Sequence, residues 1–208
     1  MRTWAADDPK AGLMARKRDV ILKAAFAAFL EDGYAGSSVN RIAEEAGVSI
    51  KTLYRHFDNK DDLFVAVIQT ACKANAGEPT WLDLPPLEGL AQAGSEHLAF
   101  ILSAEQLALY RVVTGEAPRF PELGKSYQDE VVGGRIAQLT RYFDLWPDPL
   151  RAKIRDPLRA AQTFGVLLQS DLLETALLGA PLPDPGELRA HAHQATTCLL
   201  ALIDADLL

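Results

Sequence analysis

Cysteine is scarce in this sequence, and its two cysteines show no spacing that would build a metal centre or a disulfide framework. Cys72 and Cys198 lie far apart in the 208 residues, outside any CxxC or Cys/His pattern. Zinc sites and small disulfide-linked domains depend on such patterns. We therefore expect no metal site, no cofactor and a reducing compartment, which predicts a cytoplasmic location.

Long apolar segments are also absent. The opening MRTWAADDPKAG lacks the hydrophobic region of a signal peptide, and the most apolar later stretch is interrupted by Gln169, Ser170, Asp171 and Glu174. A membrane-spanning helix needs about 20 predominantly apolar residues in succession. The sequence therefore predicts neither secretion nor a membrane partner, and residues 1–14 are expected to form a flexible tail.

The signatures of common enzyme classes are missing as well. The chain has no glycine-rich phosphate loop, no GxSxG turn and no metal-ligand spacing. His191 and His193 come nearest, but residues two apart on a helix point to different faces, so joint chelation is not expected. We propose no catalytic residue and keep an enzyme only as a competing hypothesis.

Negative charge is in excess, but it is unevenly distributed. The formal net charge is −7; residues 1–64 hold 10 basic and 10 acidic side chains, so residues 65–208 carry the whole excess. Binding to phosphates by the neutral part would need a concentrated basic patch. Arg16–Arg18 and Arg41 are candidates for it, although a run of charge is also typical of a solvated face.

The most informative segment, residues 37–64, encodes two short helices joined by a tight turn. It is SSVNRIAEEAGVSIKTLYRHFDNKDDLF. Apolar residues recur at helical spacing from Val39 to Ala46. Gly47 suits the left-handed conformation that ends many helices, and Ser49 suits the cap of the next helix. This pattern predicts a helix-turn-helix, which is a DNA-reading device.

The second of these helices has a buried face and a chemically diverse exposed face. Leu53 and Phe57, four residues apart, are expected to face the core. The other side chains would point outward, where they could contact phosphates and base edges. They are Lys51, Thr52, Tyr54, Arg55 and His56.

The helix after the motif begins with an unusual charge. Asn59 can cap it, and Asp61 and Asp62 suit the positive end of its dipole. Lys60 is unfavourable there by roughly 0.3–1 kcal/mol, unless a DNA phosphate docks at the start of the helix. We interpret Lys60 as a phosphate contact.

The segments AGVS, KTLYRHF and NKDDLF, in this order, closely resemble the DNA-binding domain of the TetR family of transcriptional regulators. The resemblance covers about residues 15–65, including an apolar stripe that ends at Gly33 and Tyr34. It implies a three-helix domain that binds double-stranded operator DNA. It also implies that Ser38 caps the first helix of the motif near a phosphate.

Two positions depart from the usual pattern of the family. Ile50 replaces a residue that is commonly basic or polar, and Lys51 replaces a common glycine, so both should alter sequence preference. Ile50 could pack on a thymine methyl group, and Lys51 could approach guanine. The complete set of predicted DNA contacts is Ser38, Arg41, Ser49, Ile50, Lys51, Thr52, Tyr54, Arg55, His56 and Lys60.

Beyond residue 65 the pattern stays helical, with few alternating β-branched runs and with breaks at proline and glycine. Helices are expected at about 60–76, 86–103, 104–116, 121–144, 156–179 and 185–206. The sequence thus predicts an all-α protein. Its DNA-binding domain would be residues 15–65, and a larger effector-binding and dimerisation domain would be residues 66–208.

The middle of the chain carries a second resemblance. LYRVVTGEAPRFPELGKSYQDE, residues 109–130, is similar to the C-terminal domain of the AefR-like branch of the TetR family. The similarity covers about residues 95–180. It supports the fold assignment but does not identify an effector.

The last two long helices are candidates for a four-helix dimer interface. Both carry broad apolar faces, which are equally compatible with a place in the monomer core; the TetR resemblance favours the homodimer. A dimer would hold two reading helices about 34–36 Å apart, or a multiple of this, on a pseudo-palindrome. The predicted interface residues are Leu168, Leu172, Thr175, Ala195, Leu199 and Leu202.

A small-molecule effector would be expected to bind between the long helices, among aromatic side chains with few polar groups. The candidate lining residues are Cys72, Trp81, His97, Phe100, Tyr110 and Phe164. The resemblance implies a repressor that an apolar or amphipathic ligand releases from its operator. Two alternatives stay open, namely a switch by cysteine oxidation and a switch by a protein partner.

Overall fold

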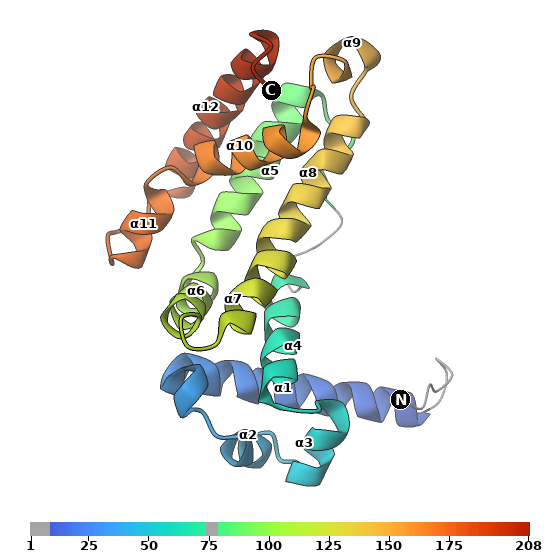
Figure 1. Ribbon diagram of the computed structural model, residues 1–208, viewed down its shortest axis with the longest axis vertical. Helices are drawn as coiled ribbons and strands as arrows, with labels where there is room; N and C mark the ends of the chain where they lie inside the picture. The colour runs from blue at the N-terminus through green and yellow to red at the C-terminus, as the bar shows by residue number, and fades with distance from the viewer. Residues whose placement is uncertain (1–8, 74–78) are drawn as a thin grey trace. The chain divides into compact units, whose positions relative to one another are not determined.

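The computed structural model describes residues 9–73 and 79–208, and every regular element among them is a helix (Figure 1). The all-α fold predicted from the sequence is therefore confirmed. The described residues form two compact units. The first comprises the chain up to Lys73 together with Leu109–Glu130, and the second comprises the remaining residues, up to Leu208.

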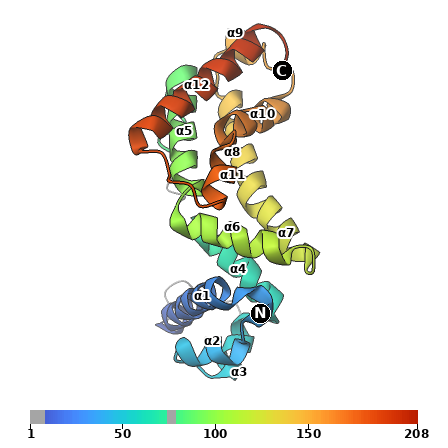
Figure 2. The same ribbon diagram turned by 90° about the vertical axis from the view of Figure 1, so that its left-hand side faces the viewer.

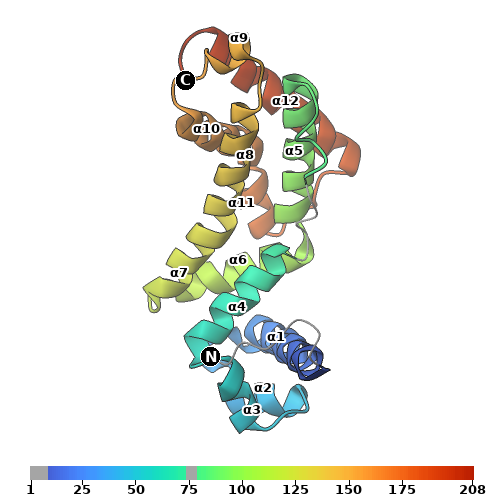
Figure 3. The same ribbon diagram turned by 90° about the vertical axis from the view of Figure 1, so that its right-hand side faces the viewer.

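The first unit contains the helix-turn-helix. The long α1 (Pro9–Gly36) packs against α4 (Lys60–Lys73), and the short helices α2 (Val39–Glu45) and α3 (Ile50–His56) lie next to each other (Figures 1 and 3). Apolar side chains from all four helices meet in its core, as the helical spacing predicts. They include Ile21, Leu22, Ala25, Phe29, Ile42, Leu53, Leu63 and Phe64.

Glycines allow the two sharp changes of chain direction in this unit. Gly33 has a φ of 72° and Gly47 a φ of 64°, in the left-handed region that other residues rarely adopt. Gly33 bends the end of α1. After Gly47, the amide of Val48 donates to the carbonyl oxygen of Ala43 at 2.9 Å, which satisfies the end of α2.

Part of the chain beyond residue 65 also belongs to the first unit. This part contains the end of α6 (Ala104–Glu116) and all of α7 (Pro121–Tyr127), and α7 packs against α4. Leu123 of α7 is only 1% exposed. The helix-turn-helix therefore shares a core with residues that lie far from it in the sequence.

The second unit is built around α5 (Pro86–Ile101), α8 (Gly134–Asp144), α10 (Pro157–Gln169) and α12 (Pro185–Asp204). The most extensive pairing is that of α5 with α12 (Figure 2). Glycine permits a close approach of α8 to α5. The hydroxyl of Tyr142 would lie 1.9 Å from a Cβ at Gly89, and it donates to the carbonyl oxygen of Leu84 at 2.8 Å.

Three details differ from the sequence prediction. The expected helix over 156–179 is divided into α10 and α11 (Leu172–Leu177), because Ser170 adopts a φ of 40°. A short α9 (Asp148–Arg151) follows Pro147 and was not predicted. The segment 121–144 is continuously helical, but a π-helical turn, η1 (Gln128–Gly133), joins α7 to α8.

Within the described residues, no single helix is long and apolar enough to cross a membrane. The pair α5 and α6 reaches that length and composition only when both are counted together, and the chain bends by 66° between them.

Candidate nucleic-acid interface

The local sequence of α3 determines which of its faces is exposed. Ser49 caps the helix: its hydroxyl oxygen accepts the amide of Thr52 at 3.2 Å, as predicted. Leu53 and Phe57 are 1% and 4% exposed, which confirms their predicted position in the core. With this face held inside, Ile50 and Tyr54 are 41% and 48% exposed.

A basic patch lies beside α3, and it is formed by side chains from two helices. The guanidinium of Arg18 on α1 lies 5.0 Å from the centre of the Phe57 ring. Arg55 contacts the sulfur of Met14 on α1, with 3.3 Å between nitrogen and sulfur. The start of α1 therefore packs next to the end of α3, where its charges can add to those of Lys51 and Arg55.

His56 lies within reach of the charges of this patch. Partial burial, followed by the charges of Arg55, Arg18 and Lys17, lowers the pKa of its imidazole below the usual value. Its Nε2 atom is buried and has no hydrogen-bond partner among the described residues. A neutral ring is favoured in the free protein. The negative charge of an incoming phosphate would offset the positive charges around the ring.

Lys60 is engaged inside the unit. Its amine donates to the carbonyl oxygen of Ser37 at 2.7 Å and lies 4.6 Å from the centre of the Tyr34 ring. Burial lowers the pKa of Lys60, and the nearby carboxylate of Glu116 partly opposes this shift. The predicted cap of the same helix is present, since Asn59 accepts the amide of Asp62 at 2.8 Å.

Arg41 is bound by three carboxylates of its own unit. Its guanidinium forms ion pairs with Asp32 at 2.5 Å, with Glu45 at 2.7 Å and with Glu31. These carboxylates raise the pKa of Arg41. Only Glu45, four residues ahead on the same helix, could have been anticipated from the sequence. The acids compete with any DNA phosphate for this side chain.

The remaining predicted contacts are also near the start of each motif helix. Ser38 is the residue at the N-terminal cap of α2, but its hydroxyl makes no capping hydrogen bond and is exposed. Lys51 is exposed, whereas Thr52 is half-buried and its hydroxyl lies 2.9 Å from that of Ser49. α2 and α3 thus present hydroxyl and amine groups together.

The predicted effector residues are divided between the two units. Trp81, His97, Phe100 and Phe164 belong to the second unit, whereas Tyr110 belongs to the first, where its ring packs 5.6 Å from that of Tyr127. The side chain of Cys72 lies outside the described residues.

Within the second unit, the four aromatic candidates have different environments. Trp81 and Phe164 are packed in the core at 5% and 0% exposure, whereas Phe100 is only partly buried against the same core. His97 is half-buried, and its Nε2 atom contacts the guanidinium of Arg135. Burial, with the charge of Arg135, lowers the pKa of His97 well below its usual value, so the ring is neutral.

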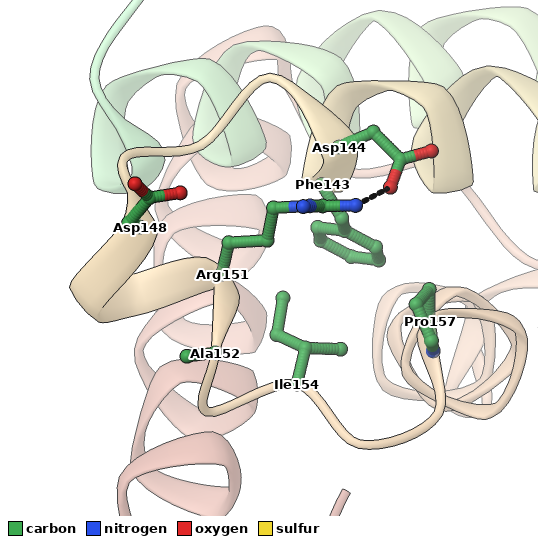
Figure 4. Close-up of a pocket in the computed structure, with 7 residues that line it drawn as sticks. All are labelled: Phe143, Asp144, Asp148, Arg151, Ala152, Ile154 and Pro157. Atoms are coloured by element: carbon green, nitrogen blue, oxygen red, sulfur yellow. Dashed lines mark hydrogen bonds and ion pairs between the residues drawn. The ribbon is translucent and has the colours of Figure 1, made fainter.

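A cavity of about 370 Å³ lies elsewhere in the second unit, beneath the ion pair of Asp144 and Arg151 (Figure 4). None of the predicted effector residues lines it. Its lining residues are Phe143, Asp144, Asp148, Arg151, Ala152, Ile154 and Pro157.

Three of the six predicted dimer residues are buried inside the second unit. Leu168, Ala195 and Leu199 are at most 4% exposed within the unit, so they belong to its core and offer no surface to a partner. The apolar stripe on α12 faces α5, and the stripe on α10 does not continue past the break at Ser170. Leu172 and Leu202 are partly buried, and Thr175 is exposed.

The outward face of α12 carries exposed side chains, whereas its inward face is buried in the core. Cys198 is exposed on this outward face. His193 is exposed, whereas Nε2 of His191 lies 2.9 Å from the carbonyl oxygen of Leu168. The two histidines have different surroundings, in agreement with the two-residue spacing. No group of three metal-ligating side chains occurs among the described residues.

Taken together, the capped two-helix motif, its buried anchors and its basic flank define a helix-turn-helix DNA-binding protein. Residues 21–67 match the family described as bacterial regulatory proteins, tetR family, and residues 88–202 match the AefR-like transcriptional repressor C-terminal domain. The chain belongs to the TetR family of transcriptional regulators, and it is not an enzyme.

Solved structures agree with this assignment. A TetR-family regulator from Mesorhizobium loti MAFF303099 is 29% identical, with a TM-score of 0.78 over 91% of this chain and 97% of that chain. The flavonoid-responsive regulator FrrA is 26% identical, with a TM-score of 0.76 over 90% of this chain and 96% of that chain.

A curated relative is similar over only a short stretch of its sequence. An HTH-type transcriptional regulator of Staphylococcus aureus (strain USA300) is 54% identical over 41 residues, which is 20% of this chain and 22% of that protein.

Proposed function

We propose that the protein is a homodimeric repressor that reads a pseudo-palindromic operator with α3 and leaves it when a small ligand binds. One observation carries the proposal. Leu53 and Phe57 anchor α3 in the core, so Lys51, Tyr54 and Arg55 point outward next to Arg18. A helix with this distribution fits a major groove, where amine, guanidinium and phenol groups contact bases and phosphates.

The other predicted contacts divide into two groups. Ser38, Ser49, Ile50, Thr52 and His56 are proposed to touch DNA because they lie on or next to the motif helices. Arg41 and Lys60 are proposed to act mainly as internal supports, since their charged groups already bind acids or a carbonyl oxygen.

The proposed dimer uses the outward faces of α10 and α12. No charged residue occurs from Ala160 to Gln169 or from Ala190 to Ile203, and Val166 is 72% exposed. Uncharged exposed faces on two adjacent helices suit a four-helix interface. The proposed interface therefore uses exposed residues of α10 and α12 in place of the buried residues that the sequence predicted.

The proposed effector is a small amphipathic molecule that binds in the second unit. A structural relative is named as flavonoid-responsive, which makes an aromatic ligand a reasonable first choice. His97 and Phe100 are the proposed contacts, because both are only partly covered by the core. A coupling of about 1–3 kcal/mol would change operator affinity by roughly 5-fold to 150-fold.

The test is selection of bound sequences from random duplex DNA by the purified protein, followed by competition at fixed salt. The expected result is an enriched pseudo-palindrome, which then serves as the probe in a panel of flavonoids and other aromatic compounds. Weak binding without enrichment would contradict operator reading. Enrichment without displacement by any compound would contradict ligand release.

A thiol switch is the second candidate, because Cys198 is exposed. If oxidation controls the protein, peroxide should reduce operator affinity and a Cys198→Ser variant should resist this effect. Unchanged affinity after peroxide treatment would remove the hypothesis.

A further inference from the structure

We infer that Glu116, the last residue of α6, is a positioning residue for DNA reading, and that its carboxylate holds the corner between α1 and α2. The inference rests on the proposed operator binding. Glu116 lies outside the DNA-binding match at residues 21–67 and inside the C-terminal match at residues 88–202. Yet it belongs to the same compact unit as the DNA-binding helices.

The carboxylate contacts the corner directly. The backbone amide of Ala35 donates to Oε1 of Glu116 at 3.0 Å. The same oxygen lies 3.1 Å from the position of a Cβ at Gly33, where φ is 72°. Gly33 thus provides both the bend and the space for the carboxylate. An acceptor that carries charge makes a stronger hydrogen bond to an amide than a neutral one.

A second set of contacts holds the corner from the α4 side. Lys60 donates to the carbonyl oxygen of Ser37, and the hydroxyl of Ser37 donates to the carbonyl oxygen of Tyr34 at 2.9 Å. The ring of Tyr34 packs edge-to-face against Phe120, with ring centres 4.9 Å apart. The segment from Glu116 to Phe120 and the start of α4 therefore enclose the corner between them.

The corner matters because α2 begins two residues after Ser37, and α2 packs against α3. A change in the direction of the chain at Ala35 would move α2, and with it the exposed face of α3. A displacement of about 1 Å is enough to weaken contacts that require a defined geometry.

Charge alone predicts the opposite effect, which makes the inference testable. Removal of an acidic side chain from a DNA-binding unit should strengthen binding to the polyanion. If Glu116 positions the corner, its removal should instead weaken binding to the operator. The sign of the change separates the two explanations.

The experiment compares Glu116→Ala and Glu116→Gln in the full chain, with Glu122→Ala and Glu122→Gln as matched controls. Glu122 is an exposed acid on α7 in the same unit. Operator affinity would be measured by fluorescence anisotropy on the selected duplex at fixed salt, and hydrogen exchange of the Ala35 amide by NMR. Thermal unfolding of each variant would be recorded as well.

We expect Glu116→Ala to bind the operator about 10-fold more weakly and to exchange the Ala35 amide faster. The operator affinity of Glu116→Gln should fall by only about 3-fold, because the amide oxygen of the glutamine still accepts the hydrogen bond. The Glu122 variants should bind as tightly as wild type or slightly more tightly.

Operator binding by a folded Glu116→Ala that equals or exceeds wild type would overturn the inference. If Glu116→Ala does not fold, the comparison of Glu116→Gln with Glu122→Gln decides in the same way. If wild type fails to distinguish the operator from a scrambled duplex, the proposed function fails. The exchange of the Ala35 amide does not depend on DNA. If this amide exchanges faster in Glu116→Ala than in wild type, the hydrogen bond to Glu116 is still demonstrated.

Discussion

At the residue scale, the orientation of α3 depends on Leu53 and Phe57, and its charge environment depends on residues brought from α1. The two anchors were predictable, because their spacing places them on one helical face. The contacts of Arg41 and Lys60 within their own unit were not predictable from the sequence. Glu31 and Asp32 approach Arg41 only after the chain bends at Gly33, and Ser37 lies 23 positions from Lys60 in the sequence.

The face assignment of α3 leads to a first prediction. Tyr54→Ala should weaken operator binding by about 1–3 kcal/mol with little effect on folding, because Tyr54 is 48% exposed. Leu53→Ala should cost roughly 2–5 kcal/mol of folding stability, because it leaves a cavity. Anisotropy titrations and thermal melts would measure both effects, with Lys23→Ala on the exposed side of α1 as control. A reversed pattern would contradict the face assignment.

His56 leads to a prediction on pH. Its folded pKa is lowered, mainly by burial, from an ordinary value of 6.5, so the unfolded chain takes up the proton first as pH falls. Stability is therefore complete above about pH 6.5 and declines as pH falls through the lowered folded pKa. His97 has a shift of the same sign and contributes in the same direction.

Chemical denaturation between pH 7.5 and 5 would test this prediction. His56→Gln should reduce the decline, whereas His193→Gln, a change at an exposed histidine of α12, should leave it as in wild type. An identical decline in wild type and His56→Gln would show that the burial of this ring has no energetic consequence.

At the element scale, each helix of the second unit has a core face, and two have an additional uncharged outward face. The sequence shows that α10 and α12 are apolar, but it does not show which side meets α5. The break at Ser170 also escapes the pattern, because leucines continue on both sides of it. Three of the six predicted interface residues, Leu168, Ala195 and Leu199, consequently lie on the core face.

The outward faces lead to a prediction on assembly. Val166→Glu should dissociate the proposed dimer, because a buried unpaired charge at an interface is costly. Operator binding should fall in parallel, since a single α3 makes half of the contacts. Leu145→Glu, at an exposed leucine outside both helices, is the control. Sedimentation would measure the mass, and an unchanged mass for Val166→Glu would exclude this interface.

At the scale of the whole molecule, the net charge of −7 conceals a neutral DNA-binding part and an acidic remainder. DNA binding must therefore come from a local patch. Arg18, Lys51 and Arg55 in each of two subunits would make about six phosphate contacts, so log K should fall with log salt with a slope of about −5.

This salt dependence can be dissected with single variants. Arg55→Ala should make the slope less steep by about 2 units, because it removes one phosphate contact in each subunit. Lys153→Ala, which removes a cation of the second unit that pairs with Asp204, should leave the slope unchanged. Equal slopes for wild type and Arg55→Ala would remove Arg55 from the phosphate contacts.

Helical spacing and capping are local properties of the chain, so the amino-acid pattern was sufficient to predict most of the helices, the turn at Gly47, the cap at Ser49 and the buried face of α3. The family followed from the same short motifs. The binding of Arg41 to acids, the place of Leu168 and Leu199 in the core, and the contact of Glu116 with Ala35 became visible only in the folded chain. Ala35 and Glu116 are 81 positions apart in the sequence, and no local spacing specifies that such distant residues meet.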